Sequence, residues 1–283
     1  TRLGENHYIM TTTTGGAATV MTKLEDFLQT EWPELKVYLT SVTDHFATVS
    51  VCGPHSKKIL EKVVENVDFS NQKFPHMSFK EGSIDKIKCR VMRISFTGEL
   101  SYEINIQANY GQAVWEKCMD AGKEFGITPY GTEAMHLLRA EKGFVIVGQE
   151  TDGTVTPVDL QMDWIINKKK YDFIGKRSLY RSDTMRKDRK QMVGLLTSDP
   201  KEVLEEGAQI VVNVKKKPPM DIVGHVTSSY YSPNLNKSIA LAVVKNGKNL
   251  KGQKLYVPMS NKVIEVTVSD SIFLDKEGSR LNA

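Results

Sequence analysis

The composition is that of a globular protein with nearly balanced charge. The chain has 283 residues, of which 38 are basic and 34 acidic, for a formal net charge of +4. This balance argues against a nucleic-acid-binding protein, and no apolar run approaches the roughly 20 residues that a membrane helix needs. The three cysteines are widely spaced and lack a CxxC pair, so they predict neither a metal site nor a disulfide framework. We expect a cytoplasmic protein with reduced thiols.

The first part of the chain alternates between helical and strand-like periodicity. Apolar side chains at helical spacing, with proline or glycine near the ends, predict helices at 17–32, 54–64, 111–125 and 130–142. Alternation of apolar and polar residues predicts strands at 37–42, 46–52, 87–97 and 101–107. Such an irregular succession of helices and strands is typical of α+β layers.

The pattern changes at Arg181–Lys190, which is charged, has no apolar period and is interpreted as a linker. Beyond it come five or six short strands separated by glycine, proline and asparagine turns. That spacing is typical of a small β-barrel. The predicted organisation is therefore an α+β domain at 1–185 and a C-terminal barrel domain at 186–283.

Polar residues interrupt the apolar face of the predicted helix 130–142. His136, Arg139 and Glu141 are interleaved with its apolar positions, and a dense polar turn, 149–153, follows a short apolar run. A helix that leads into a polar turn beside a buried segment is a suitable wall for a small polar ligand. The alternative is a buried helix with a satisfied arginine–glutamate pair.

Two turns offer further polar groups. Thr97-Gly98 forms a tight turn that could aim Glu99 inward from a strand end, although a turn glutamate in solvent is the commoner outcome. Thr11–Thr14 offers four successive hydroxyls before Gly15-Gly16, where the backbone allows a ligand to approach closely. Alternatively, these threonines only favour a strand and cap the following helix.

Three segments together resemble the folate-binding aminomethyltransferase family, whose best-known member is the glycine-cleavage T-protein. They read RISFTGELSYEINI, TPYGTEAMHLLRAEKGFVIVGQETDGTVTPVDL and GHVTSSYYSPNLNKSIALAVV. With the opening LGENHYIMTTTTGGAA, the second segment is similar more narrowly to the C-terminal, tetrahydrofolate-binding region of heterotetrameric sarcosine oxidase alpha subunits. The resemblance runs from Leu3 to the last strands near Phe273.

This resemblance implies a folate-binding fold that supports one-carbon transfer. The flavin part of the whole oxidase would oxidise sarcosine, and this region would hold tetrahydrofolate or its polyglutamate to capture the carbon as 5,10-methylenetetrahydrofolate. Flavin and NAD are expected only in other parts of the parent complex, and the other oxidase subunits are the expected partners. One alternative is a T-protein that acts on an aminomethyl-lipoyl carrier protein. Another is a folate-binding scaffold module without catalysis.

The family's TGE motif places its pterin-binding glutamate at Glu99. The pterin ring presents a 2-amino group beside a ring N–H, and a carboxylate can accept both hydrogen bonds in parallel. A Val-Asn pair that contacts the pterin in T-proteins falls on Thr12 and Thr13, and threonine cannot supply the asparagine amide. Binding through Thr13 Oγ1 or the backbone remains open.

The family comparison also changes the interpretation of the helix 130–142. T-proteins have an Arg-Asp pair where this chain has Met135-His136, so the glutamyl tail of folate must be held in another way or left looser. His136 and Arg139 are the remaining candidates for a folate contact on this helix. Arg139 has an alternative structural role through Glu141 or a backbone carbonyl. The segment TSSYYSP at 227–233 is expected to be a loop of the barrel, either closing one side of the pocket with its hydroxyls and tyrosine rings or serving only as a structural loop.

The first residue is Thr1, and residues 2–10 already have the pattern of a fold, which suggests a folate-binding domain truncated at its N-terminus. In the family, the acidic residue that serves the one-carbon transfer lies upstream of this point. We therefore assign no catalytic residue within the chain, expect no metal site, and expect the isolated chain to be inactive.

Overall fold

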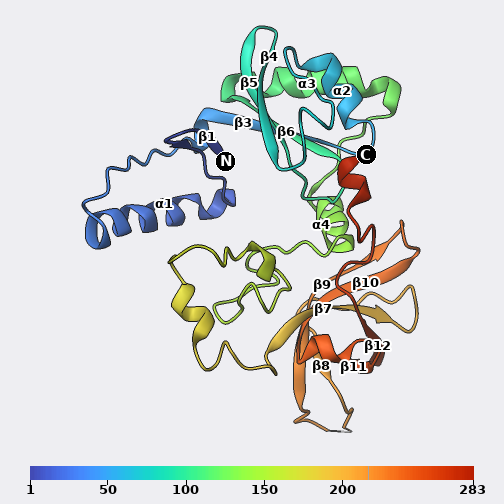
Figure 1. The fold of residues 1–283 in the computed structure, drawn as a ribbon. Coiled ribbons are helices and arrows are strands. Elements are labelled where there is room, and N and C mark those ends of the chain that lie inside the picture. The colour runs from blue at the N-terminus through green and yellow to red at the C-terminus, as the bar shows by residue number, and fades with distance from the viewer. Residues whose placement is uncertain (216) are drawn as a thin grey trace. The chain divides into compact units, whose positions relative to one another are not determined.

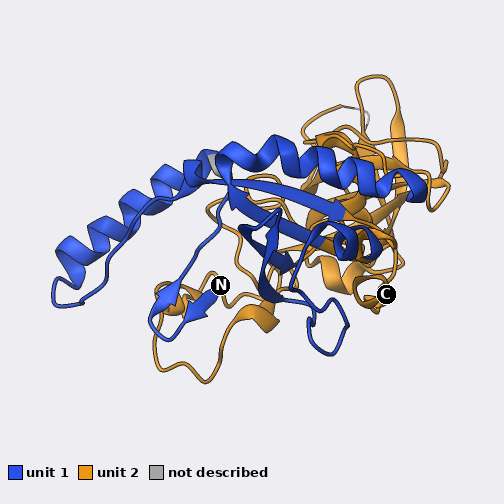
Figure 2. Ribbon diagram, turned by 90° about the horizontal axis from the view of Figure 1, so that it is seen from above, with its two compact units in different colours: residues 1–51, 58–93, 102–126 blue, residues 52–57, 94–101, 127–283 orange. Residues whose placement is uncertain are grey.

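The computed structural model describes residues 1–215 and 217–283, and for Thr14 the backbone only. The chain folds into two compact units, which Figure 2 colours separately. The first comprises 1–51, 58–93 and 102–126, and the second comprises 52–57, 94–101 and 127–283. In this division, residues 127–189 belong to the same unit as the C-terminal strands. The domain boundary that we expect at residue 185 stays a prediction.

A four-stranded sheet forms the centre of the first unit, with helices α2 (Ser56–Val63) and α3 (Gly111–Gly122) beside it (Figure 1). The strand order is β3 (Phe46–Cys52), β6 (Ser101–Gln107), β5 (Ile87–Arg93) and β4 (Ser78–Ile84). The predicted alternation in β6 is confirmed, since Tyr102, Ile104 and Ile106 are all fully buried. Tyr102 also meets Phe69 edge to face, with ring centroids 5.4 Å apart.

The N-terminal part of this unit contains a short hairpin and one long helical segment. Strands β1 (Arg2–Gly4) and β2 (His7–Tyr8) pair antiparallel, and α1 (Ala17–Asp26) continues as a π-helical stretch, Phe27–Glu31. The expected strand at 37–42 is wrong, because no regular element is assigned there. Tyr38 is 95% exposed, so the apolar residues that suggested a strand have no sheet to pack against.

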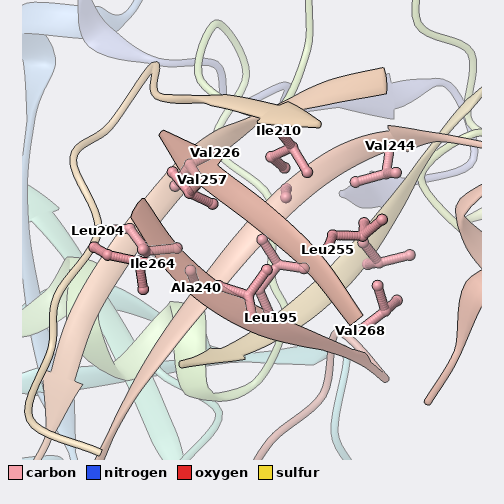
Figure 3. Packing of buried hydrophobic residues seen from close by; sticks show 13 residues of the cluster. Leu195, Leu204, Ile210, Val226, Ala240, Val244, Leu255, Val257, Ile264 and Val268 are labelled. Carbon is pink, nitrogen blue, oxygen red and sulfur yellow. The ribbon is translucent and has the colours of Figure 1, made fainter. Parts of the chain in front are cut away.

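The second unit contains a closed six-stranded barrel, which confirms the predicted C-terminal barrel. Its cyclic order is β10 (Lys237–Lys245), β7 (Lys190–Thr197), β12 (Val263–Ser269), β11 (Lys254–Pro258), β8 (Gln209–Val211) and β9 (Ile222–Ser232). Figure 3 shows the apolar side chains that fill the interior, among them Leu195, Val226 and Val257. Closure removes exposed sheet edges, and the interior of the barrel is a packed core.

Strand β10 is buried on both faces, which positions helix α4 (Thr132–Glu141). Ala240 and Ala242 face the barrel interior, whereas Ile239 and Leu241 pack with Ala140 of α4. The predicted helix 130–142 is therefore confirmed with slightly shorter bounds. Its last turn is fixed against the outside of the barrel by apolar contacts. None of the helices within the described residues is long and apolar enough to cross a membrane.

The cysteines differ in burial, and this predicts their reactivity. Burial raises the pKa of Cys89 and of Cys118 to about 11, whereas Cys52 is half-buried. Because the thiolate is the reactive form, the native protein at pH 8 should react with Ellman's reagent first at Cys52. We expect one fast equivalent, with the other two appearing only after unfolding. A Cys52→Ser variant that keeps the fast phase would contradict this assignment.

Candidate functional site

Glu99 lies on the tight turn between β5 and β6. The amide of Gly98 donates to Ser95 Oγ at 3.0 Å, and Gly98 has a φ of +81°, which side chains rarely adopt. A Cβ at this glycine would lie 2.8 Å from Cγ of Lys142. The glycine therefore allows both the turn and the close packing of the Lys142 side chain. The Glu99 side chain that follows it is 20% exposed.

The C-terminal segment supplies a partner for Glu99. Nη1 of Arg280 donates to Oε1 of Glu99 at 2.6 Å, as a charge-assisted hydrogen bond. Arg280 lies in a single 3-10 turn, Ser279–Asn282. The Arg280 side chain is 43% exposed, so the pair lies at the surface of the second unit. Nothing in the sequence pattern marks Arg280, because it is 181 residues from Glu99.

Asp275 organises the turn that carries Arg280. Its carboxylate accepts hydrogen bonds from the Ser279 hydroxyl, from the backbone amides of Ser279 and Arg280, and from Nζ of Lys142 at 3.0 Å. The Ser279 hydroxyl, followed by the Lys142 ammonium and the two amides, holds the pKa of Asp275 well below its usual range. Asp275 is therefore ionised and tied to the end of α4 through Lys142.

A second, fully buried cluster surrounds Arg139, whose exposed fraction is 0%. Its Nη1 donates to Oε2 of Glu150 at 2.7 Å and to the carbonyl of Phe144, and its Nη2 donates to Oγ of Ser228 at 2.6 Å and to the Gln149 side chain. The Ser228 hydroxyl in turn donates to Oε1 of Glu150 at 2.5 Å. Both terminal nitrogens are thus used inside the protein, which favours the structural alternative for Arg139.

Glu141 forms a separate buried cluster with the end of β9. Oγ of Ser232 donates to Oε1 of Glu141 at 2.5 Å, and Nδ2 of Asn234 donates to Oε2 at 2.9 Å. Glu141 therefore pairs with β9 and its following turn, while Arg139 takes Glu150 as its partner. The expected loop at 227–233 is wrong, because residues up to Ser232 belong to β9. The strand can bury these serines because their hydroxyls form hydrogen bonds with the buried charged side chains of α4.

The other predicted site residues, His136, Thr12 and Thr13, do not belong to the clusters of Glu99, Arg139 and Glu141. His136 is half-buried on α4, one turn before Arg139. Thr12 and Thr13 belong to the first compact unit, where Oγ1 of Thr12 donates to the carbonyl of Thr13 at 3.1 Å. That carbonyl also accepts the amide of Gly16, which forms the turn before α1. The fourth threonine of the run, Thr14, has its side chain outside the described residues.

The geometry around Glu99 leaves part of its carboxylate available for further hydrogen bonds. A carboxylate has about four acceptor sites, and the contact with Arg280 uses one of them. The remaining oxygen can accept hydrogen bonds from a planar ligand that presents N–H groups. The sequence pattern identified Glu99 but missed Lys142 and Arg280, which the structure brings together with it.

Two family models match the chain. The GCVT N-terminal domain matches residues 1–170, and the glycine cleavage T-protein C-terminal barrel domain matches residues 190–275. The crystal structure of the glycine cleavage system aminomethyltransferase T from Bartonella henselae has a similar fold, with a TM-score of 0.77 and 20% identity. The alignment covers 93% of this chain and 67% of that one, and confirms the predicted aminomethyltransferase-like fold.

Curated relatives cover nearly the whole chain. The sarcosine oxidase subunit alpha of Corynebacterium sp. (strain P-1) is 51% identical over 284 residues, and that of Rhizobium meliloti (strain 1021) is 38% identical over 285 residues. Each alignment includes 99% of this chain but 29% of the relative's length. An aminomethyltransferase of Clostridium botulinum (strain Loch Maree / Type A3) is 31% identical over 245 residues, which are 86% of this chain and 64% of that protein.

Proposed function

Because this chain belongs to the glycine cleavage T-protein family, we propose that it binds tetrahydrofolate as part of a sarcosine oxidase alpha subunit. The 51% identity to such a subunit over 99% of the chain supports this assignment. Within the whole oxidase, the chain would hold tetrahydrofolate while it captures the one-carbon unit released from sarcosine, giving 5,10-methylenetetrahydrofolate. Flavin and NAD would be bound by other parts of that complex.

The observation that carries the proposal is the Glu99 carboxylate on its glycine turn. Gly98 lets the turn pack on Lys142, and Arg280 neutralises one carboxylate oxygen without covering the group, since Glu99 remains 20% exposed. The 2-amino group and ring N–H of a pterin are the kind of planar donor pair that such a carboxylate accepts. The residues of the turn therefore fit folate as a ligand.

The contribution of this chain to one-carbon capture is positioning. Holding the folate amine beside the reactive carbon converts a bimolecular step into an effectively unimolecular one. The buried clusters of Arg139 and Glu141 fix α4 against β9, and Lys142 at the end of α4 supports the Glu99 turn. We assign Arg139 to this supporting role. His136, Thr12 and Thr13 remain proposed secondary contacts for folate.

Replacing Glu99 by glutamine tests the proposal. Glutamine has nearly the same shape but exchanges an acceptor for a donor, which would face the donor edge of the pterin. A hydrogen bond to a charged group contributes about 1.5–3 kcal/mol, so the Kd for tetrahydrofolate should rise roughly tenfold to a hundredfold. The measurement is titration calorimetry on the natural full-length polypeptide that carries this sequence.

A matched control is Glu133→Gln, which alters an exposed glutamate in the first turn of α4. This control should leave the Kd unchanged. Unchanged affinity in Glu99→Gln would mean that Glu99 is only a turn residue, and absence of tetrahydrofolate binding by the unmodified protein would reject the proposed function itself.

A further inference from the structure

The C-terminal turn around Asp275 carries Arg280, whose guanidinium contacts the Glu99 carboxylate of the proposed folate site. We infer that Arg280 is a positioning residue, which holds Glu99 in the one orientation that leaves its second oxygen open to the pterin donor edge. The inference rests on the proposed function. It assigns to Arg280, Asp275 and Lys142 a common role that the sequence pattern did not indicate.

The first step of the argument is the geometry at Glu99. The contact with Arg280 is made by one nitrogen, Nη1, to one oxygen, Oε1, at 2.6 Å. A bidentate guanidinium pair would occupy both oxygens and compete with a ligand that has the same donor pattern. The single contact instead restrains Oε1 while Oε2 keeps its acceptor sites. Glu99 is therefore oriented before the ligand arrives.

The second step concerns Arg280, which has a flexible side chain and needs a fixed backbone to act in this way. The carboxylate of Asp275 accepts the amide of Arg280 at 3.0 Å and the amide of Ser279 at 2.9 Å. Further back, the amides of Phe273 and Leu274 donate to the carbonyl of Glu141 at 2.9 and 3.0 Å. The segment that carries Arg280 is thus held to the end of α4 by backbone hydrogen bonds, and its last turn is held by the carboxylate of Asp275.

Lys142 joins the two sides of this arrangement. Its aliphatic stem lies against Gly98, next to Glu99, and its Nζ donates to the side chain and to the backbone carbonyl of Asp275. Only 8% of the Lys142 side chain is exposed, and the same fraction of the Asp275 side chain. A buried and hydrogen-bonded pair of this kind is costly to disrupt from one side, so the spacing between the Glu99 turn and the Arg280 turn is well defined.

An oriented carboxylate binds more tightly because less side-chain freedom is lost when the ligand arrives. Arg280→Met removes the charge and the hydrogen bonds but keeps an unbranched, flexible stem. The Kd for tetrahydrofolate should rise about three- to tenfold in this variant, the effect of freeing one rotamer-rich side chain. Arg280→Lys restores a cation that can reach Oε1, and it should recover most of the affinity.

The experiment is calorimetry of tetrahydrofolate binding to the full-length polypeptide in the unmodified form and in four variants. These are Arg280→Met, Arg280→Lys, Glu99→Gln and the double variant Arg280→Met/Glu99→Gln. If Arg280 acts through Glu99, its replacement should change the Kd by less than twofold once Glu99 is already glutamine. A folate analogue without the 2-amino group should likewise bind equally well to the unmodified protein and to Arg280→Met.

The outcomes separate this inference from the proposed function. Failure of the unmodified protein to bind tetrahydrofolate rejects both. Normal binding by the unmodified protein with unchanged or tighter binding by Arg280→Met rejects the positioning role and leaves the proposed function standing. The positioning role would also be overturned if Arg280→Met lowered the affinity by the same factor in the unmodified protein and in Glu99→Gln. Arg280 would then act independently of the Glu99 carboxylate.

Discussion

Replacing Arg139 by methionine is expected to lower the free energy of unfolding of the second compact unit by about 3–5 kcal/mol, the range for breaking one side of a buried ion pair. The substitution leaves the Glu150 carboxylate buried with hydrogen bonds from Ser228 and from the amide of Ile146 but without its guanidinium partner. Urea denaturation followed by circular dichroism measures the effect. The loss should be large because both side chains of the pair are 0% exposed.

Two controls separate this effect from the removal of any positive charge. Lys262 pairs with Glu202 at 2.7 Å, but the lysine side chain is 49% exposed, so Lys262→Met should cost less than about 1 kcal/mol. The double variant Arg139→Met/Glu150→Leu also removes the Glu150 carboxylate, so no buried charge is left without its partner. Its destabilisation should be smaller than the sum of the two single effects by about 0.5–3 kcal/mol. Strict additivity would show that the two side chains do not depend on one another.

Alanine in place of Gly224 should destabilise the barrel by about 1–3 kcal/mol or more, because it forces an extra carbon into a closed sheet. The new Cβ would lie 2.2 Å from the carbonyl oxygen of Val243 and 2.9 Å from Cα of Val244. Both are backbone atoms of β10, which pairs with β9 at this point, so neither can move without disturbing the ladder. A drop in the midpoint of thermal unfolding is the measurement.

The matched control for this prediction is Gly153→Ala in the polar turn after α4. No heavy atom lies within 4 Å of the Cβ that this change adds, so its stability should be unchanged or slightly higher. Equal midpoints for the two variants would mean that the barrel accommodates the methyl group, and that the close approach of β9 and β10 at Gly224 is not a constraint.

The sequence by itself determined the elements whose evidence is local. Period-two alternation identified β6, helical spacing identified α4, and the short strands after Lys190 identified the barrel, because each pattern reflects burial of one face. The Glu99 turn was also visible, since a glycine beside a hydrogen-bonding residue marks a turn without reference to distant parts of the chain. The family of the chain could be inferred for the same reason, from motifs that are continuous in sequence.

The tertiary structure alone decided which charged groups pair. Arg139 bonds to Glu150 in place of its neighbour Glu141, and Glu99 bonds to Arg280, at a separation of 181 residues. Ser232 pairs with Lys237 in the ladder of β9 and β10, and its hydroxyl donates to the buried carboxylate of Glu141. The local sequence does not identify the partner of a buried charged side chain, because any group that the fold brings within hydrogen-bond distance can stabilise that charge. Propensity and period therefore predicted the elements, while long-range burial selected the contacts that build the candidate site.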